Sequence, residues 1–375
     1  MLGALLALLA LHALPCHTCI VDEDCSLNGV CSGAQCVCDP GWRGGDCGVL
    51  NLAPAVRYSG YNLTGNGPSS WGGKVVQDPA EPTLHHLFAA EFTGGCGLDY
   101  WSPMSRIIRA ESRTGPAGPY AFAQEVVGTF AHNPTVVWSA AEQLYLMYHI
   151  GCPYPQPASC STPHFSCAPG DGANAESGIT VRTSKDLRSW QRLPGYALGV
   201  APGAWDEDNT NPSALVLANG SVVLAYRGCP AECRGAELLG LALAPCAAGP
   251  YTRTSPAASI LPQDATEDPN LWQDARGHWH MLSHSLEPGG GWGGGPKVGR
   301  HAFARDLLGS WTWGNTSLAY STTVAYTDGS VDVLNRRERP QLLFAENGHT
   351  PTFLINGVQA AGKSSSFTLI QPVAP

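Results

Sequence analysis

Six cysteines within residues 19–47 constrain the fold of this 375-residue chain more than any other feature. A segment of about thirty residues buries too little apolar surface to stay folded alone, so cross-links must limit its unfolded state. Six cysteines allow roughly 15 pairings, and spacing alone does not choose among them. The sequence therefore predicts a disulfide-rich module over residues 16–48, with cysteines at Cys19, Cys25, Cys31, Cys36, Cys38 and Cys47.

The end of this segment resembles the EGF-like family. In Cys36-Val-Cys38-Asp-Pro-Gly-Trp-Arg-Gly-Gly-Asp-Cys47, glycines and a tryptophan lie between the last two cysteines, as in that family's C-terminal hairpin. The resemblance implies the disulfides Cys19–Cys31, Cys25–Cys36 and Cys38–Cys47. Zinc is the alternative, but thiolates at these spacings suit zinc better in a reducing cytosol. The nearby acidic residues follow the first cysteine rather than precede it, so we expect no metal here and a role in adhesion, spacing or extracellular protein contact.

The N-terminus indicates secretion. Residues 1–15 carry an apolar run of about a dozen residues, which is too short to span a membrane and is typical of a signal-peptide core. Disulfides need an oxidising compartment, which also favours an extracellular location. No second long apolar stretch follows, so we expect no membrane span. Three sequons predict N-glycosylation, at Asn62, Asn219 and Asn315.

The composition limits the classes of partner and fold. The formal net charge is -9 and no basic cluster occurs, which argues against a nucleic-acid partner. Hydrophobic residues make up 43% of the chain, with 11 Trp, 12 Tyr and 9 Phe, enough for a packed core. Short strand-like runs alternate with Gly, Pro and Asn turns, and helical periodicity is weak. We therefore predict an all-β domain over residues 55–365.

A repeat within that domain predicts its architecture. Five times a polar residue followed by proline opens an apolar strand, at Asp78-Pro79, Asn133-Pro134, Asn211-Pro212, Asp268-Pro269 and Arg339-Pro340. The spacings fit one four-stranded blade plus loops, and radial stacking of such units leaves few free strand edges. The sequence thus predicts a five-bladed β-propeller, with a β-sandwich or jelly roll as the alternative.

The segment Thr183-Ser-Lys-Asp-Leu-Arg-Ser-Trp190 resembles a turn of the five-bladed arabinanase, xylosidase and fructosidase glycoside hydrolases. The resemblance implies an active site with three carboxyl groups, contributed by the first, second and third blades. Asp78 fits the first position. Asn133 and Asn211 occupy the other two, and an amide cannot transfer a proton as an acid does.

Other side chains could supply the missing acids. We predict Asp78, Asp268, Glu267 and Glu338 as catalytic residues, because glycoside hydrolysis needs one protonated and one ionised carboxyl group. Substrate binding is assigned to a second set, with the arginines suited to an anionic sugar and the tryptophan to a sugar face. This set comprises Asn133, Asn211, Arg337, Arg339 and Trp272.

These patterns predict a secreted carbohydrate-active protein that hydrolyses glycosidic bonds of a polysaccharide without a cofactor. The alternative is a non-catalytic carbohydrate-binding or adhesion protein that has kept the propeller and lost the acids. The two asparagines at the openings of the second and third blades favour this alternative.

Overall fold

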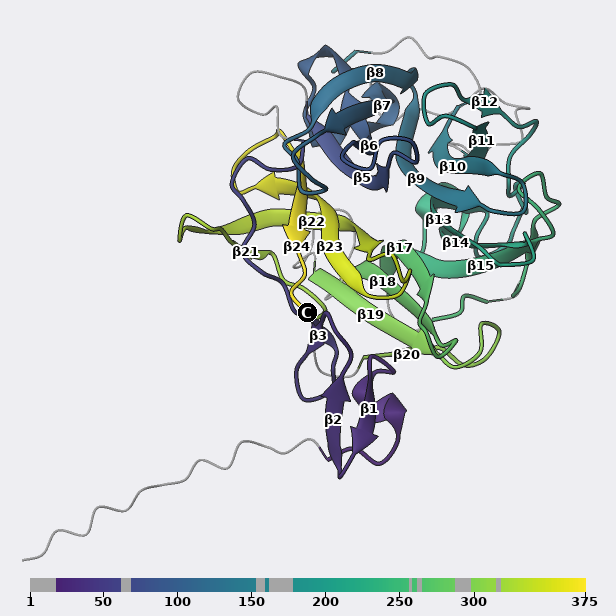
Figure 1. The fold of residues 1–375 in the computed structure, drawn as a ribbon. Helices are drawn as coiled ribbons and strands as arrows, with labels where there is room; N and C mark the ends of the chain where they lie inside the picture. Colours follow the sequence, from purple (N-terminus) through teal and green to yellow (C-terminus); the bar gives the residue numbers. More distant parts are fainter. Residues whose placement is uncertain are drawn as a thin grey trace, which may run out of the picture.

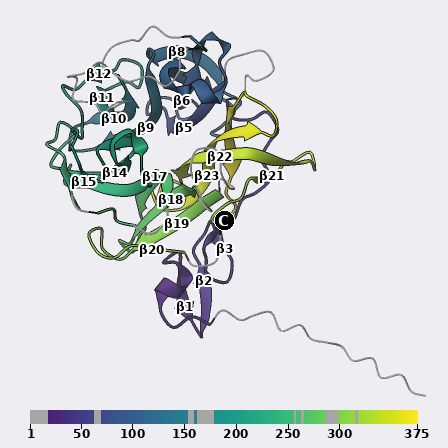
Figure 2. The ribbon, with the colours of Figure 1, turned by 180° about the vertical axis from the view of Figure 1, so that it is seen from behind.

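The fold was analysed in a computed structural model, which describes residues 18–61, 69–152, 159–161, 178–255, 258–261, 265–286, 298–314 and 318–375. Residues 1–15, Asn62 and Asn315 lie outside these ranges. Figure 1 shows a ring of blades with a small module below it, beside the C-terminus. The same arrangement is seen from behind in Figure 2. Within the described residues, no helix has the length and apolar character needed to cross a bilayer.

The small module contains two short antiparallel ribbons and a 3₁₀ turn. Its disulfides join Cys19 to Cys31, Cys25 to Cys36 and Cys38 to Cys47, which is the pairing that the EGF-like resemblance implies. Its elements are η1 (Asp22–Cys25), β1 (Gly29–Ser32), β2 (Gln35–Cys38), β3 (Trp42–Arg43) and β4 (Val49–Leu50).

Five four-stranded antiparallel sheets form the propeller, so the predicted five blades are confirmed and the sandwich alternative is wrong. Blade one contains β5 (Ser70–Gln77), β6 (His85–Phe92), β7 (Ser105–Ser112) and β8 (Ala121–Val127). Blade two contains β9 (Ala131–Ser139), β10 (Leu144–Gly151), β11 (Gly178–Ser184) and β12 (Gln191–Arg192). Blade three contains β13 (Asp208–Val216), β14 (Val222–Cys229), β15 (Leu238–Ala244) and β16 (Thr252–Arg253).

The last two blades complete the ring. Blade four contains β17 (Thr266–Gln273), β18 (Trp279–Ser285), β19 (Val298–Ala304) and β20 (Thr312–Trp313). Blade five contains β21 (Thr323–Ala325), β22 (Val331–Phe344), β23 (Pro351–Ala360) and β24 (Phe367–Pro372). Short helical turns connect some strands, namely η2 (Thr93–Gly95), η3 (Leu98–Tyr100), α1 (Trp101–Met104) and η4 (Ala231–Cys233).

The chain closes the ring by pairing its two ends. The segment between the small module and blade one runs along β24, where Tyr61 and Thr368 exchange backbone hydrogen bonds. Farther along, the Ala53 amide donates to the Pro372 carbonyl. This pairing covers the edge of β24, which would otherwise expose unpaired backbone groups. The last strand ends at Pro372, past residue 365 where we expected the domain to end.

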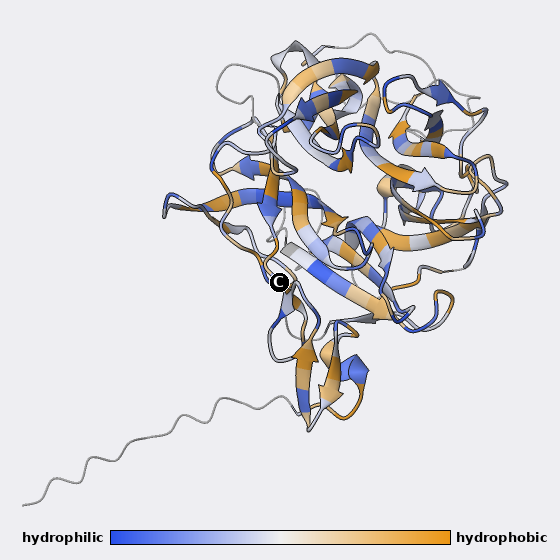
Figure 3. Ribbon diagram, viewed as in Figure 1, coloured by the Kyte–Doolittle hydropathy of each residue, from blue (hydrophilic) through white to orange (hydrophobic). Residues whose placement is uncertain are grey.

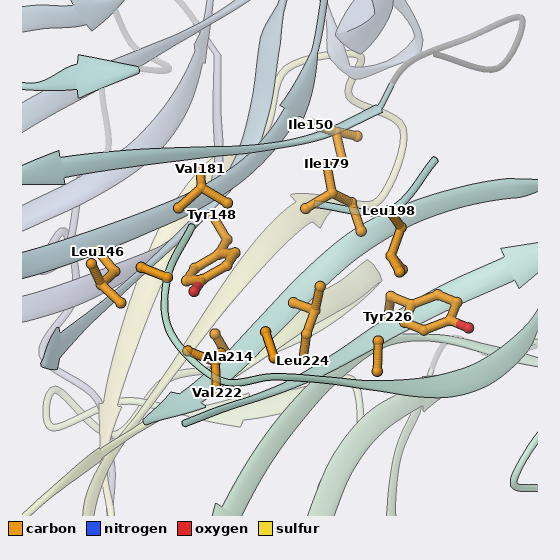
Figure 4. Packing of buried hydrophobic residues seen from close by; sticks show 13 residues of the cluster. Leu146, Tyr148, Ile150, Ile179, Val181, Leu198, Ala214, Val222, Leu224 and Tyr226 are labelled. Atoms are coloured by element: carbon orange, nitrogen blue, oxygen red, sulfur yellow. The ribbon is translucent and has the colours of Figure 1, made fainter. Parts of the chain in front are cut away.

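The hydrophobic core lies between neighbouring blades, not at the axis. Figure 4 shows the layer between blades two and three, where Tyr148 and Ile179 face Leu224 and Tyr226. Because both faces of each blade are covered, strands such as β14 are buried along their whole length. Hydrophobic segments accordingly recur in every blade in Figure 3.

Candidate active site

The innermost strand of every blade contains the same bulge. Each bulge places a residue at a φ of 53–61° and interrupts the register with the second strand. Glycine, asparagine and aspartate tolerate this conformation best, and four of the five positions hold one of them. The bulge residues are Gly72 (φ 55°), Asn133 (φ 55°), Asn211 (φ 53°), Asp268 (φ 61°) and Arg339 (φ 56°).

These bulges surround one pocket near the propeller axis, which we call the axial pocket. Its free volume is about 60 Å³. The half-buried Trp101 and Arg336 belong to its wall. The remaining lining residues are Trp71, Leu98, His132, Asn133, Asn211, Arg227, Glu237, Glu267, Asp268, Leu286, Glu338 and Arg339.

Six of the residues predicted from the sequence meet in this pocket, and three do not. Those that meet are Glu267, Asp268, Glu338, Asn133, Asn211 and Arg339. Those that the structure places elsewhere are Asp78, Trp272 and Arg337.

Asp78 does not occupy the bulge position of blade one. That position belongs to Gly72, and Asp78 follows β5 at the other end of the strand. Its carboxylate accepts hydrogen bonds from His86 Nε2 and Arg188 Nη2, both at 2.9 Å. Burial raises its pKa, but the bonds from His86, the Ala80 amide and Arg188 outweigh that effect and lower it to about 2. Asp78 is therefore a buried structural anion away from the axial pocket.

Blade one has glycine at its bulge, where the other four blades have a polar residue followed by proline. A Cβ atom added at Gly72 would lie 2.9 Å from Arg339 Cβ, so the two bulges touch across the blade boundary. Only glycine combines the positive φ with this close approach.

Trp272 and Arg337 belong to the packing of the ring. Trp272 is 4% exposed and stacks on Trp42 of the EGF-like module. The buried Arg337 guanidinium donates to Asn356 Oδ1 at 2.9 Å and to Gln371 Oε1 at 2.8 Å. Side chains alternate between the faces of a strand, so Arg337 points away from the pocket that its neighbour Glu338 lines.

A hydrogen-bonded chain links blades two, three and four around the pocket. Asn133 Nδ2 donates to Asn211 Oδ1 at 2.8 Å, and Asn211 Nδ2 donates to Glu267 Oε2 at 3.2 Å. The two asparagines thus orient one another and then Glu267. They occupy the places where we expected acids from the family resemblance.

Asp268 is held as an anion by two neighbours. Arg339 donates to it through its backbone amide at 3.2 Å and through its guanidinium, and His284 Nδ1 donates at 2.9 Å. Burial would raise the pKa of Asp268, but the charges of Arg339 and His284 hold it well below the usual range. Both oxygens of Asp268 are engaged, so this carboxylate is suited to positioning.

Glu267 has the opposite environment. Burial, and then the charges of Glu237 and Asp268, raise the pKa of Glu267 well above its ordinary value. Arg227 Nε lies 3.8 Å from Glu267 Oε2 and 3.3 Å from Glu237 Oε2. A buried carboxyl group with a raised pKa can carry a proton at neutral pH and donate it.

Glu338 presents an acceptor to the pocket. Its Oε1 atom is buried and has no hydrogen-bond partner among the described residues. One carboxylate oxygen of Glu338 and one of Glu267 lie within 4.8 Å of each other, together with atoms of Asp268 and His284. A buried polar atom without a partner is costly, and it is commonly satisfied by a ligand or water.

His284 supplies positive charge among these acids. Burial lowers its pKa, but the charge of Glu338 and the bond to Asp268 raise it to about 9. The His284, Glu267, Asp268 and Glu338 atoms are close enough to hold a cation. A metal ion there would have to displace the proton of His284 and compete with Arg339 for Asp268, so the arrangement suits proton transfer better.

Three charged residues of the pocket, Arg227, Glu237 and Arg336, were not predicted from the sequence. Arg227 ends the apolar run Val222-Val-Leu-Ala-Tyr226, and a charged residue inside such a strand is the pattern that could have revealed it. Glu237 precedes β15 in a loop, and nothing in its local sequence marks it.

Comparisons with known proteins find a match for each of the two parts of the chain. Residues 21–49 match the family model of the Teneurin-like EGF domain. The first module is therefore EGF-like. Among curated proteins, none matches the sequence.

Solved structures of glycoside hydrolases share the propeller fold. A family 117 glycoside hydrolase of Zobellia galactanivorans superposes with a TM-score of 0.57 at 12% identity, covering 86% of this chain and 88% of that chain. The GH62 alpha-L-arabinofuranosidase catalytic domain of Coprinopsis cinerea gives 0.54 at 11% identity, covering 85% and 95%. An endo-arabinase of Bacteroides thetaiotaomicron gives 0.52 at 12% identity, covering 86% and 98%. At these identities the likeness defines the fold only, a five-bladed propeller.

Proposed function

We propose that this protein is a secreted glycosidase whose axial pocket binds a sugar residue at the end of a glycan and cleaves its glycosidic bond. The observation that carries the proposal is the pair Glu267 and Glu338. The carboxyl group of Glu267 has a strongly raised pKa, and Glu338 has one oxygen without a hydrogen-bond partner among the described residues. One oxygen of each of the two groups lies within 4.8 Å of an oxygen of the other. The three disulfides of the EGF-like module and the propeller fold of known glycoside hydrolases support an extracellular carbohydrate-active protein.

The two carboxyl groups divide the chemistry. Glu267 donates its proton to the glycosidic oxygen as the bond to the anomeric carbon breaks. Glu338 attacks the anomeric carbon and forms a glycosyl ester. Glu267, now ionised, then takes a proton from a water molecule that releases the sugar and regenerates Glu338. Enzymes that use this two-step route have carboxyl groups about 5–5.5 Å apart, whereas those that invert configuration have them about 6.5–9.5 Å apart. Because oxygens of Glu267 and Glu338 lie within 4.8 Å of each other, the proposal includes retention of anomeric configuration.

Neighbouring groups tune these roles. Burial, and then the negative charges of Glu237 and Asp268, raise the pKa of Glu267. Asn211 orients the same carboxyl group.

Carbohydrate binding without turnover is the second candidate. Asn133 and Asn211 favour it, because the two amides bond to each other at positions where the family resemblance places acids.

A glycan panel separates the two candidates. Wild-type protein, Glu267→Gln and Glu346→Gln are tested for both binding and release of reducing ends. Glu346 is exposed in the β22–β23 turn, so its variant is a matched control. The glycosidase proposal predicts turnover that falls by about 10²–10⁴-fold in Glu267→Gln only. Binding with no release of sugar from any glycan would leave the lectin-like function and overturn the glycosidase.

A further inference from the structure

A second cavity opens at the other end of the innermost strands, and we call it the rear cavity. Its volume is about 440 Å³, within the range of about 300–1,000 Å³ of small-molecule sites. All five blades contribute to it, through Lys74, Thr135–Trp138, Ser213–Ala218, Asn270–Gln273, Gln341–Phe344, Gly348 and His349.

A ring of polar side chains lies between the axial pocket and the rear cavity. In each blade the ring residue comes two positions after the bulge residue, and it lines the rear cavity instead of the axial pocket. The ring residues are Lys74, Thr135, Ser213, Asn270 and Gln341. Four of them are neutral, so blade one alone places a charge at this level of the axis.

The neutral ring members satisfy one another and the backbone. Asn270 Oδ1 accepts from the Leu342 amide at 2.9 Å, and Ser213 Oγ accepts from the Leu271 amide at 3.0 Å. Gln341 Oε1 lies 3.5 Å from both Thr135 Oγ1 and Asn270 Nδ2. These side chains therefore need no ligand.

Lys74 lacks a compensating anion. Its Nζ atom donates to the Leu342 carbonyl at 2.8 Å, and among the described residues it forms no ion pair. No carboxylate occurs among the described residues that line the rear cavity, where the other titratable side chain is His349. Burial lowers the pKa of Lys74 to about 8. Lys74 is half-buried, and an anionic ligand in the cavity would supply the counter-ion that its ammonium group lacks among the described residues.

Beyond the polar ring, much of the wall of the rear cavity is apolar. Val137, Leu215 and Phe344 line the cavity, and Trp138 lines it while remaining 43% exposed. The Trp138 ring packs against Tyr145, with ring centroids 4.7 Å apart, which holds it in place. A ligand that fits this cavity has one anionic group and an apolar body.

We propose that the rear cavity binds a small organic carboxylate with an aromatic or aliphatic body, its carboxylate bonded to Lys74 and its body against Trp138 and Phe344. This site is separate from the axial pocket, so the inference stands independently of the glycosidase proposal.

Benzoate and its uncharged analogue benzyl alcohol are suitable probes. Each is titrated by calorimetry into wild-type protein, Lys74→Met and Lys185→Met. Methionine keeps the length and apolar stem of lysine, and Lys185 is exposed in the β11–β12 turn. The proposal predicts that wild-type protein prefers benzoate by about tenfold or more. Lys74→Met should lose that preference, and Lys185→Met should keep it.

The pH dependence gives a readout that needs no variant. Benzoate affinity of wild-type protein should fall as pH rises from 7 to 9.5, because Lys74 loses its charge with a pKa of about 8. Benzyl alcohol affinity should stay constant over that range. Equal binding of benzoate by Lys74→Met and wild type, or affinity independent of pH, would overturn the proposal. Failure to detect benzoate binding by wild-type protein would overturn it as well.

Discussion

Replacing Trp42 by alanine tests how the EGF-like module is joined to the propeller. The Trp42 indole is 7% exposed, and it stacks on Trp272 with ring centroids 6.2 Å apart and planes 14° apart. It also contacts His301, at 5.0 Å between ring centroids. Two exposed arginines of blade four add ion pairs, Arg276 with Asp39 and Arg305 with Glu23.

The indole should dominate this interface. Truncation of a buried tryptophan to alanine costs about 3–5 kcal/mol. Ion pairs between exposed groups contribute about 0–1 kcal/mol. The stacked pair itself should add about 0.5–1.5 kcal/mol of coupling between Trp42 and Trp272.

Urea unfolding followed by far-UV circular dichroism measures these free energies. The four proteins are wild type, Trp42→Ala, Trp272→Ala and the double variant, with Arg305→Ala as control. We expect the free energy of unfolding to fall by about 3–5 kcal/mol in Trp42→Ala and by less than about 1 kcal/mol in Arg305→Ala. A change below about 0.5 kcal/mol for Trp42→Ala, or zero coupling in the cycle, would refute the docking of the module on blade four.

Asp78→Asn should leave glycan turnover unchanged, because Asp78 lies outside the axial pocket. It should lower the free energy of unfolding in urea by about 1–3 kcal/mol, because the carboxylate accepts hydrogen bonds from His86 and Arg188. Loss of turnover in a folded Asp78→Asn variant would contradict the position of Asp78 outside the axial pocket. Burial holds the pKa of His132 and of His301 well below the usual value, so the unfolded chain takes up protons below about pH 6.5 that the folded chain cannot. The free energy of unfolding should therefore fall by up to about 1.4 kcal/mol per pH unit per histidine between pH 6.5 and 5.5, and a flat profile would contradict their buried neutral state. Asn219 is exposed at the β13–β14 turn, so protein secreted from eukaryotic cells should lose mass on endoglycosidase treatment, and Asn219→Gln should remove part of that loss.

The propeller could be predicted from the sequence because similar residue types recur at the bulges. Asn133, Asn211 and Asp268 tolerate positive φ, and each is followed by proline, so the pattern is visible without a structure. Blade one solves the same backbone problem with Gly72, which led us to assign Asp78 to the wrong end of the strand. Arg339 fits the proline pattern although arginine is unusual at positive φ, and its two bonds to Asp268 accompany that conformation.

The remaining errors concern which way side chains face. Alternation along β22 separates Arg337 from Glu338, and this could have been predicted from the strand period. The position of the Trp272 side chain could not be predicted from the sequence. Both faces of β17 are buried, and Trp272 lies on the face against which Trp42 stacks. The approach of Glu237 and Arg227 to Glu267 depends on contacts between a loop, a second strand and the next blade, which local patterns do not encode.

Replacement of Glu338 by alanine tests the glycosidase proposal most directly. On the most active substrate of the panel, turnover by Glu338→Ala is measured with and without sodium azide. We predict a loss of at least about 10²-fold, partial rescue by azide, and a glycosyl azide of inverted configuration, since azide would take the position of the missing carboxylate. Turnover by Glu338→Ala equal to that of wild type would contradict the assignment of catalysis to the axial pocket.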